Sequence, residues 1–214
     1  MYKSLFTGAS VCLLTSVLSF GATIFDSGDV SLTANDPIQE GRLDRNVVPS
    51  DWSSQKPFPG VVDPNTSFHY VAFDIPASPF PFLQITSDDV SGSDHTFAAA
   101  YLNSYQPDST AANRGLDTNY LGDVGQSGNR SGNPSVFQVV ANSPLTNHLE
   151  VVVSDTTSTN SAIGQDFRIR VEGFTDTQFD DRNPAAAPEP ANVALTGLGF
   201  AVASFALKRR RAKA

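Results

Sequence analysis

The sequence predicts a mostly β protein, with a single β-sandwich or jelly-roll-like domain over residues 22–174 and an apolar segment at each end. Short apolar runs recur through this region, separated by segments rich in Gly, Ser, Asn, Asp and Pro. No long stretch repeats its apolar residues every 3.6 positions, as an amphipathic helix would. The roughly 165 residues between the two ends fit one domain.

Residues 1–21 have the layout of a secretory signal peptide. Lys3 provides the basic start, Val11–Phe20 is a short apolar stretch, and small residues follow it. We expect export with cleavage after Gly21, or after Ala22 as the second choice. The apolar stretch is too short to span a bilayer as an uncleaved anchor.

The part of the chain that remains after export is acidic and lacks cysteine. The one cysteine, Cys12, lies in the signal segment, so we expect no disulfide and a fold stabilised by burial alone. Lys3 and the five cations from Lys208 onward account for six of the 14 Lys and Arg. The other eight stand against 22 Asp and Glu, a net charge of −14. This charge argues against nucleic acid and anionic lipid as partners and favours solubility.

Seven runs have strand character. The clearest is the last, where Phe167, Ile169 and Val171 alternate with charged residues, as in a strand with one buried face. Leu149–Val153 is rich in β-branched residues, which favours a central strand. The seven runs are Val30–Thr33, Phe68–Ile75, Phe82–Thr86, Thr96–Tyr105, Ser135–Ala141, Leu149–Ser154 and Phe167–Phe174.

Ser87–Asp94 is predicted to be a turn-rich segment with three carboxylates, Asp88, Asp89 and Asp94. Such a density of oxygen atoms is what Ca²⁺ requires, although the segment lacks the Glu that closes an EF-hand loop. We expect a solvated turn and no metal or other cofactor, with Ca²⁺ as the alternative.

Residues typical of catalysis are few. The three histidines, His69, His95 and His148, are far apart in the sequence, and no Gly-x-Ser-x-Gly, His-Glu-x-x-His or phosphate-binding glycine motif occurs. We therefore expect a protein that is not an enzyme. The alternative is a secreted hydrolase whose Ser, His and Asp come from distant segments.

Five aromatic residues have two interpretations. They form either a face that stacks against carbohydrate or, as is more common in a sandwich, part of the core and its edges. They are Trp52, Tyr70, Tyr101, Tyr105 and Tyr120.

The C-terminal 40 residues have three parts after a linker, residues 175–187, of Asp, Asn, Pro and Ala. Pro188, Glu189 and Pro190 form a stiff, extended tripeptide. Ala191–Leu207 is an uncharged run of 17 residues, about 25 Å of helix, and is predicted to cross the membrane. Cations then follow that mark the cytoplasmic side, namely Lys208, Arg209, Arg210 and Arg211. A plain single-pass anchor has the same topology and is the alternative. A buried core helix is disfavoured, because such a helix would show a polar face and this run has none.

This order of tripeptide, apolar span and basic end resembles the PEP-CTERM sorting signal of Gram-negative and related bacteria, over residues 188–214. The resemblance implies that Pro188, Glu189 and Pro190 are recognised by an exosortase, a membrane processing enzyme. It also implies transient insertion in the inner membrane and then delivery to the cell surface or the extracellular matrix. An association with exopolysaccharide follows from the same resemblance.

Blocks within the domain are similar to secreted bacterial β-sandwich modules that are not catalytic. The blocks are Asp36–Arg45, Lys56–Gly60, Phe68–Tyr70, Ala100–Tyr105 and Thr118–Asp123. The similarity spans about residues 36–174 and implies a binding or structural role.

Overall fold

The computed structural model describes residues 21–92, 94–129, 132–141, 148–176 and 178. The predicted signal peptide, apart from Gly21, and the whole predicted sorting signal, residues 188–214, lie outside this part. The predicted membrane helix, 191–207, lies outside it too. Within the described ranges, no helix has the length and apolar character that crossing a membrane requires.

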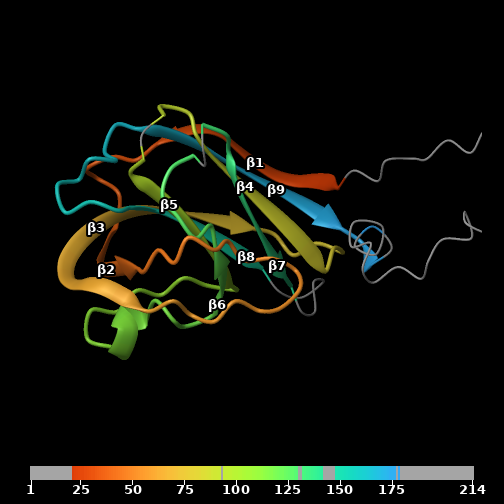
Figure 1. Ribbon diagram of the computed structural model, residues 1–214, viewed down its shortest axis with the longest axis horizontal. Coiled ribbons are helices and arrows are strands. Elements are labelled where there is room, and N and C mark those ends of the chain that lie inside the picture. The colour runs from red at the N-terminus through yellow and green to blue at the C-terminus, as the bar shows by residue number, and fades with distance from the viewer. Residues whose placement is uncertain (1–20, 93, 130–131, 142–147, 177, 179–214) are drawn as a thin grey trace, which may run out of the picture.

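The described chain forms two antiparallel sheets, which confirms the mostly β prediction (Figure 1). One sheet has four strands in the order β1-β9-β4-β7, and the other has five in the order β2-β3-β8-β5-β6. A short 3₁₀ turn, η1, covers Ala112–Gly115. The strands are β1 (Ala22–Ser31), β2 (Ile38–Leu43), β3 (Val61–Ile75), β4 (Phe82–Asp89), β5 (Thr96–Leu102), β6 (Tyr120–Asp123), β7 (Ser135–Val140), β8 (Leu149–Asp155) and β9 (Asp166–Phe174).

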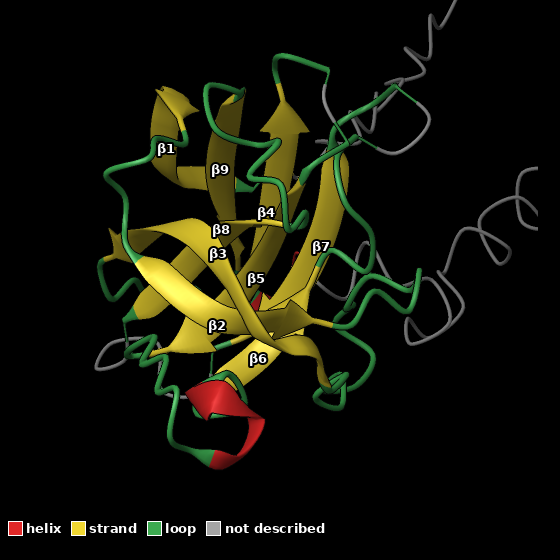
Figure 2. Cartoon of the chain, turned by 90° about the vertical axis from the view of Figure 1, so that its left-hand side faces the viewer, coloured by secondary structure: helices red, strands yellow, loops and turns green. Residues whose placement is uncertain are grey.

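The strand pairs are nested along the chain. The innermost pair is β5 with β6, followed outward by β4 with β7, β3 with β8 and β1 with β9. One long antiparallel hairpin, rolled so that successive pairs fall alternately in the two sheets, produces this order (Figure 2). This is the strand arrangement of a jelly roll, with β2 added as an extra edge strand beside β3.

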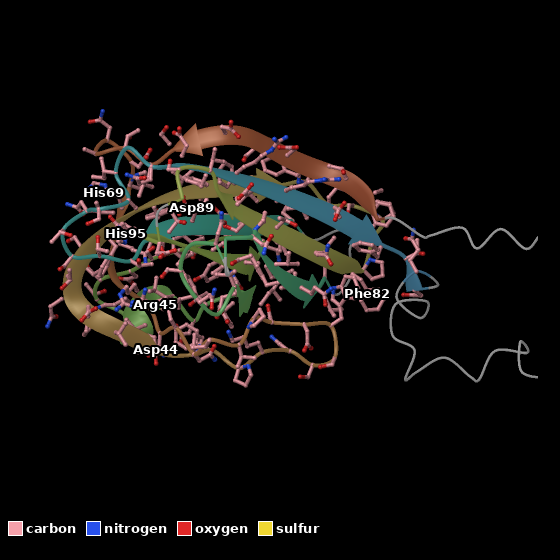
Figure 3. All side chains as sticks on the ribbon, turned by 45° about the horizontal axis from the view of Figure 1, so that its top comes forward. Asp44, Arg45, His69, Phe82, Asp89 and His95 are labelled. Carbon is pink, nitrogen blue, oxygen red and sulfur yellow. The ribbon has the colours of Figure 1, made fainter. Side chains whose placement is uncertain are left out.

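The nesting brings the two ends of the domain together. Ala22 at the start of β1 pairs with Gly173 near the end of β9, and Phe82 pairs with Phe174 in the same end of the sheet. Figure 3 places Phe82 near this end and Arg45 toward the other. The chain therefore enters and leaves the domain at one end.

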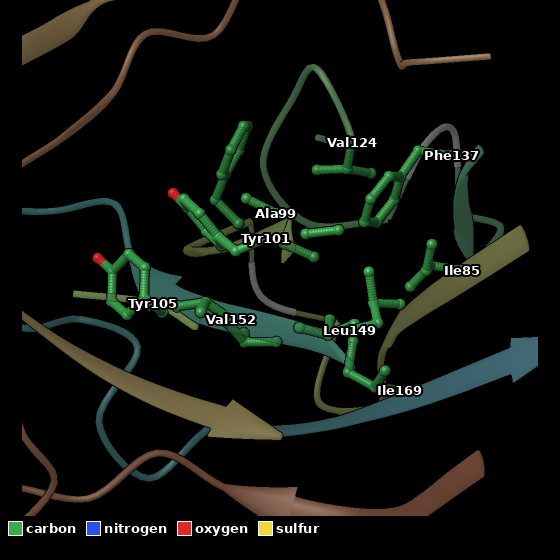
Figure 4. Packing of buried hydrophobic residues seen from close by; sticks show 14 of the residues in the cluster. Ile85, Ala99, Tyr101, Tyr105, Val124, Phe137, Leu149, Val152 and Ile169 are labelled. Carbon is green, nitrogen blue, oxygen red and sulfur yellow. The ribbon is translucent and has the colours of Figure 1, made fainter. Parts of the chain in front are cut away.

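The core lies between the two sheets. Phe73 of β3 packs edge-on against Phe167 of β9, with ring centroids 6.1 Å apart, so Phe73 faces the four-stranded sheet. Val151 of β8 pairs with Phe73, and Ala100 of β5 pairs with Val151. Both residues are fully buried on the same face of the sheet as Phe73. Figure 4 shows Leu149 in the same core cluster as Ile85 and Ile169, which belong to the opposite sheet. The predicted alternation in β9 is confirmed, because Phe167, Ile169 and Val171 are all buried.

Several strand boundaries differ from the prediction. β2 and β6 were not predicted, because β2 is largely polar and β6 has only four residues. β3 begins at Val61 although Pro64 argues against a strand. The proline is tolerated because it lies in a bulge, where Asp63 has a positive φ of 51° and the register with β2 shifts. β5 ends at Leu102, before the predicted end, because Asn103 turns with a φ of 65°.

The segment of residues 44–60, called the clasp below, closes one side of the roll. Ser50 donates its backbone N–H to Asp123 of β6, and its carbonyl accepts from Gln138 of β7, at 2.9 Å each. It thus bridges the edges of the two sheets, where backbone groups would otherwise lack partners. At the tip of the clasp, the Trp52 indole donates to the Leu83 carbonyl at 3.1 Å.

Gly125 is required where the clasp meets the domain. A side-chain carbon there would lie 2.5 Å from the Val48 carbonyl carbon. Gly132 has the same φ of 77°, with nothing within 4 Å of the equivalent position. We expect Gly132→Ala to cost about 1–2 kcal/mol for the left-handed backbone alone. Gly125→Ala should cost about 1–3 kcal/mol more, because the clasp must move.

The two free energies of unfolding, measured by chemical denaturation, test this difference. Equal losses would show that the clasp does not pack closely on Gly125.

Candidate functional site

A surface depression of about 340 Å³ lies between the clasp and the segment that leads into β6. Pro57 and Phe58 of the clasp contribute its apolar part, and exposed Gln55 and Asp117 contribute polar groups at its rim. The remaining lining residues are Lys56 and Tyr120, both buried. We call this the Phe58 depression.

A row of aromatic rings supports the floor of the depression. Phe58 meets Tyr120 edge-on at a centroid distance of 5.5 Å, and Tyr120 meets Tyr101 at 6.1 Å. Tyr105 continues the row, 4.6 Å from Tyr101 and 5.1 Å from Tyr70. The row lies on the face of the five-stranded sheet that points away from the core between the sheets. Aromatic rings thus cover a face that would otherwise be open to water.

Beneath the floor lies a buried ion pair between Lys56 and Asp123, at 2.5 Å, with side chains 7% and 0% exposed. Lys56 also donates to the side chain of Asn46 at 2.9 Å and to the Val48 carbonyl. The three N–H groups of its ammonium therefore each have an acceptor. The pair ties the clasp to the end of β6.

Asp123 is satisfied from three sides. It accepts from Lys56, from the Gly125 backbone N–H at 2.6 Å and from the Tyr120 hydroxyl. Burial, the Asp123 charge and the hydrogen bond to Asp123 together raise the pKa of Tyr120 well above its ordinary value. Tyr120 consequently stays protonated and donates its hydroxyl hydrogen to Asp123. This hydrogen bond holds the ring of Tyr120 in place under Phe58.

An apolar ring bordered by hydrogen-bonding side chains is the arrangement that binds small polar molecules with one apolar face. The pyranose ring of a sugar is such a group. Phe58 and Pro57 offer the apolar surface, while Gln55 offers an amide and Asp117 a carboxylate. Lys56 and Tyr120 are committed to Asp123 and act by holding the floor.

The predicted carboxylate segment is not a turn throughout, which corrects the prediction. β4 extends to Asp89, so Asp88 and Asp89 are neighbours on a strand and point to opposite faces. Asp89 is buried and accepts from Thr96, whereas Asp88 accepts from Asn129 at 3.1 Å. Among the described residues, no group of three or more His, Cys, Asp or Glu is arranged to hold a metal ion.

Asp94 lines a second, more open depression of about 500 Å³. Its other lining residues are Arg45, Gln126, Ser127 and Asn129. The three carboxylates of the predicted cluster are thus distributed over the core, the strand surface and this depression.

The three histidines have separate environments. The Nδ1 of His69 lies 3.0 Å from the Asp36 carbonyl oxygen, and that of His148 lies 3.2 Å from a carboxylate oxygen of Asp74 at the surface. The backbone carbonyl of His95 accepts from Thr156. Figure 3 shows His69 and His95 at the end of the domain opposite to Phe82.

The predicted aromatic face is divided. The four tyrosines come together, but Tyr101, Tyr105 and Tyr120 are buried, as in the interpretation of these residues as core. Trp52 instead packs against Phe82 and Phe174, at centroid distances of 5.8 and 5.1 Å. Neither the rim residues, Gln55 and Asp117, nor the ion pair of Lys56 was predicted from the sequence. No pattern in the sequence distinguishes these side chains from ordinary surface residues.

Comparisons with protein-family models, with curated proteins and with solved structures find no match for this chain.

The ion pair has a measurable role in stability. Lys56→Met removes the cation and leaves Asp123 buried without it, which should cost about 3–5 kcal/mol. Arg170→Met removes a half-exposed cation from a pair with Glu172, at 2.9 Å, together with one hydrogen bond to the Thr23 hydroxyl, and should cost about 1 kcal/mol.

Chemical denaturation of both variants at neutral pH tests the comparison. A loss for Lys56→Met no larger than that for Arg170→Met would mean that the clasp is held by other contacts.

Proposed function

We propose that the protein is an exported, non-enzymatic binding domain that its C-terminal tail directs to the cell surface or extracellular matrix. Its ligand is a polysaccharide, and the ligand site is the Phe58 depression. The observation that carries this proposal is the combination of a supported aromatic floor with an exposed polar rim. The jelly-roll arrangement supports it further, because lectin domains use the same architecture.

The rim residues suit hydrogen bonds to sugar hydroxyls. The Gln55 amide can both donate and accept, and the Asp117 carboxylate accepts. Both residues are exposed, so their removal leaves the core unchanged. The side chain of Asp117 has one internal partner, the Asn113 amide at 2.9 Å.

Polysaccharide binding is tested with the purified full chain on a glycan array and by isothermal titration with the best ligand. Gln55→Ala and Asp117→Ala should each weaken binding about tenfold, the effect of one lost hydrogen bond of about 1.4 kcal/mol. Thr159→Ala, an exposed substitution in the loop between β8 and β9, is the control. Unchanged affinity in both rim variants would place the ligand elsewhere.

The tail provides the second part of the proposal. Ala191–Leu207 and the cations that follow suffice for membrane topology, so Pro188, Glu189 and Pro190 can act as a recognition element for an exosortase-type enzyme. A permanent membrane anchor is the competing outcome.

Glu189→Ala should leave membrane insertion intact and stop processing, so that the uncleaved protein accumulates in the inner membrane. Asp181→Ala, a matched acidic substitution in the linker, should be processed normally. Cell fractionation and intact mass are compared in hosts with and without an exosortase. Wild-type protein that keeps Ala214 in both hosts would establish the permanent anchor.

A further inference from the structure

The depression that contains Asp94, called the Arg45 depression below, has an unusual cation. Arg45 donates from Nη1 to the Ser127 hydroxyl at 2.7 Å, and the amide side chains of Gln126 and Asn129 line the same space. Asn129 is fixed by hydrogen bonds to Asp89, because its amide bonds to both the backbone N–H and the carbonyl of that residue, at 2.7 and 3.0 Å. The depression is thus bordered by polar groups of defined position.

Arg45 differs from the other cations of the domain. Among the Lys and Arg side chains of the described residues, it is the one that forms no ion pair. This is notable because residues 22–174 contain 18 Asp and Glu against seven Lys and Arg. Burial and the neighbouring Arg42 charge lower the pKa of Arg45, despite the opposing effects of Asp44 and Asp63. Asp44 and Asp63 thus act on Arg45 without forming an ion pair with it, so its guanidinium can still take an anionic partner in direct contact.

The clasp connects this depression to the Phe58 depression. Asp44 donates its backbone N–H to the Gly60 carbonyl at 3.0 Å, and Lys56 bonds to the Asn46 side chain, so the two arms of the clasp run side by side. Arg45 lies on one arm and Phe58 on the other. A chain of several sugars that crosses the clasp can contact both depressions.

We propose that the polysaccharide carries carboxylated sugars and that Arg45 binds the carboxylate of a uronic acid, which makes it the residue that determines specificity. This inference rests on the proposed function and extends it to a ligand class. The guanidinium matches a carboxylate with two parallel hydrogen bonds. Gln126 lies where its amide can bond to a hydroxyl of the same sugar, whereas both amide N–H groups of Asn129 are already donated to Asp88 and Asp89.

The net charge of the domain limits which anionic chains can bind. Densely charged polymers such as nucleic acid are repelled, but this repulsion is screened beyond about 8–10 Å at physiological salt. A glycan whose uronates alternate with neutral sugars mainly experiences the local field of Arg45. Asp44 and Asp94 near the site add to the selection against dense polyanions.

The experiment compares hyaluronan, whose uronates alternate with neutral sugars, with its methyl ester, which lacks the charge. The full chain should bind hyaluronan about tenfold more tightly than the ester. Arg45→Gln should abolish this preference by lowering the affinity for hyaluronan to about that for the ester. Arg45→Lys, which keeps the charge but lacks the planar fork, should retain only part of it.

Arg168→Gln is the matched control, because it removes one cation from the outer face of the four-stranded sheet. It should keep the preference. Equal binding of polymer and ester by wild type, or an unchanged preference in Arg45→Gln, would overturn the inference alone, provided that Gln55→Ala and Asp117→Ala still weaken binding. No binding of either polymer, together with no hit on the glycan array, would overturn the inference and the proposed function together.

Discussion

The buried contact between Lys56 and Asp123 is the constraint on which the clasp depends. A buried ion pair adds little net stability by itself, because both charges lose their hydration. Its effect here is positional: it fixes the clasp at the end of β6, so that Ser50 can bridge the two sheet edges. Through Asp123, the same contact orients Tyr120 under Phe58. One buried interaction therefore holds both the surface around Phe58 and the segment that protects the two sheet edges.

The rolled hairpin makes such a clasp necessary. Nested pairing places β6 and β7, which are consecutive in the chain, at the edges of different sheets. An open edge is a template for association with other chains, and the described domain contains no cysteine that a disulfide would need. A loop of 17 residues that bonds to both edges closes this side at the expense of chain entropy. The aromatic row closes the outer face of the five-stranded sheet in a similar way.

Much of the fold could be predicted from the sequence, and little of the site. Alternation identified β9, and β-branched residues identified β8, because their burial pattern follows directly from the strand period. β2 escaped prediction because its pairing with β3, not its composition, makes it a strand. The sequence predicts a turn at Asp88 and Asp89, because nothing in it shows that the pairing of β4 with β9 extends to these residues. The contact of Lys56 with Asp123 spans 67 positions, and no local pattern encodes a contact of that range.

The position of the chain ends bears on how a tethered domain meets its ligand. Ala22 and Gly173 are paired, so both ends leave from one side, while Arg45 lies toward the other (Figure 3). If the chain is held by its C-terminus, as proposed, the linker of 13 residues spans at most about 45 Å when extended. That reach lets the domain turn while its ends stay toward the membrane. In the proposed anchored state the Arg45 depression would then face away from the membrane, so ligand binding would not require release of the tail. The proposed sorting and the proposed binding are therefore separable in this chain: the tail would determine where the domain is displayed, and the clasp would determine what it presents there.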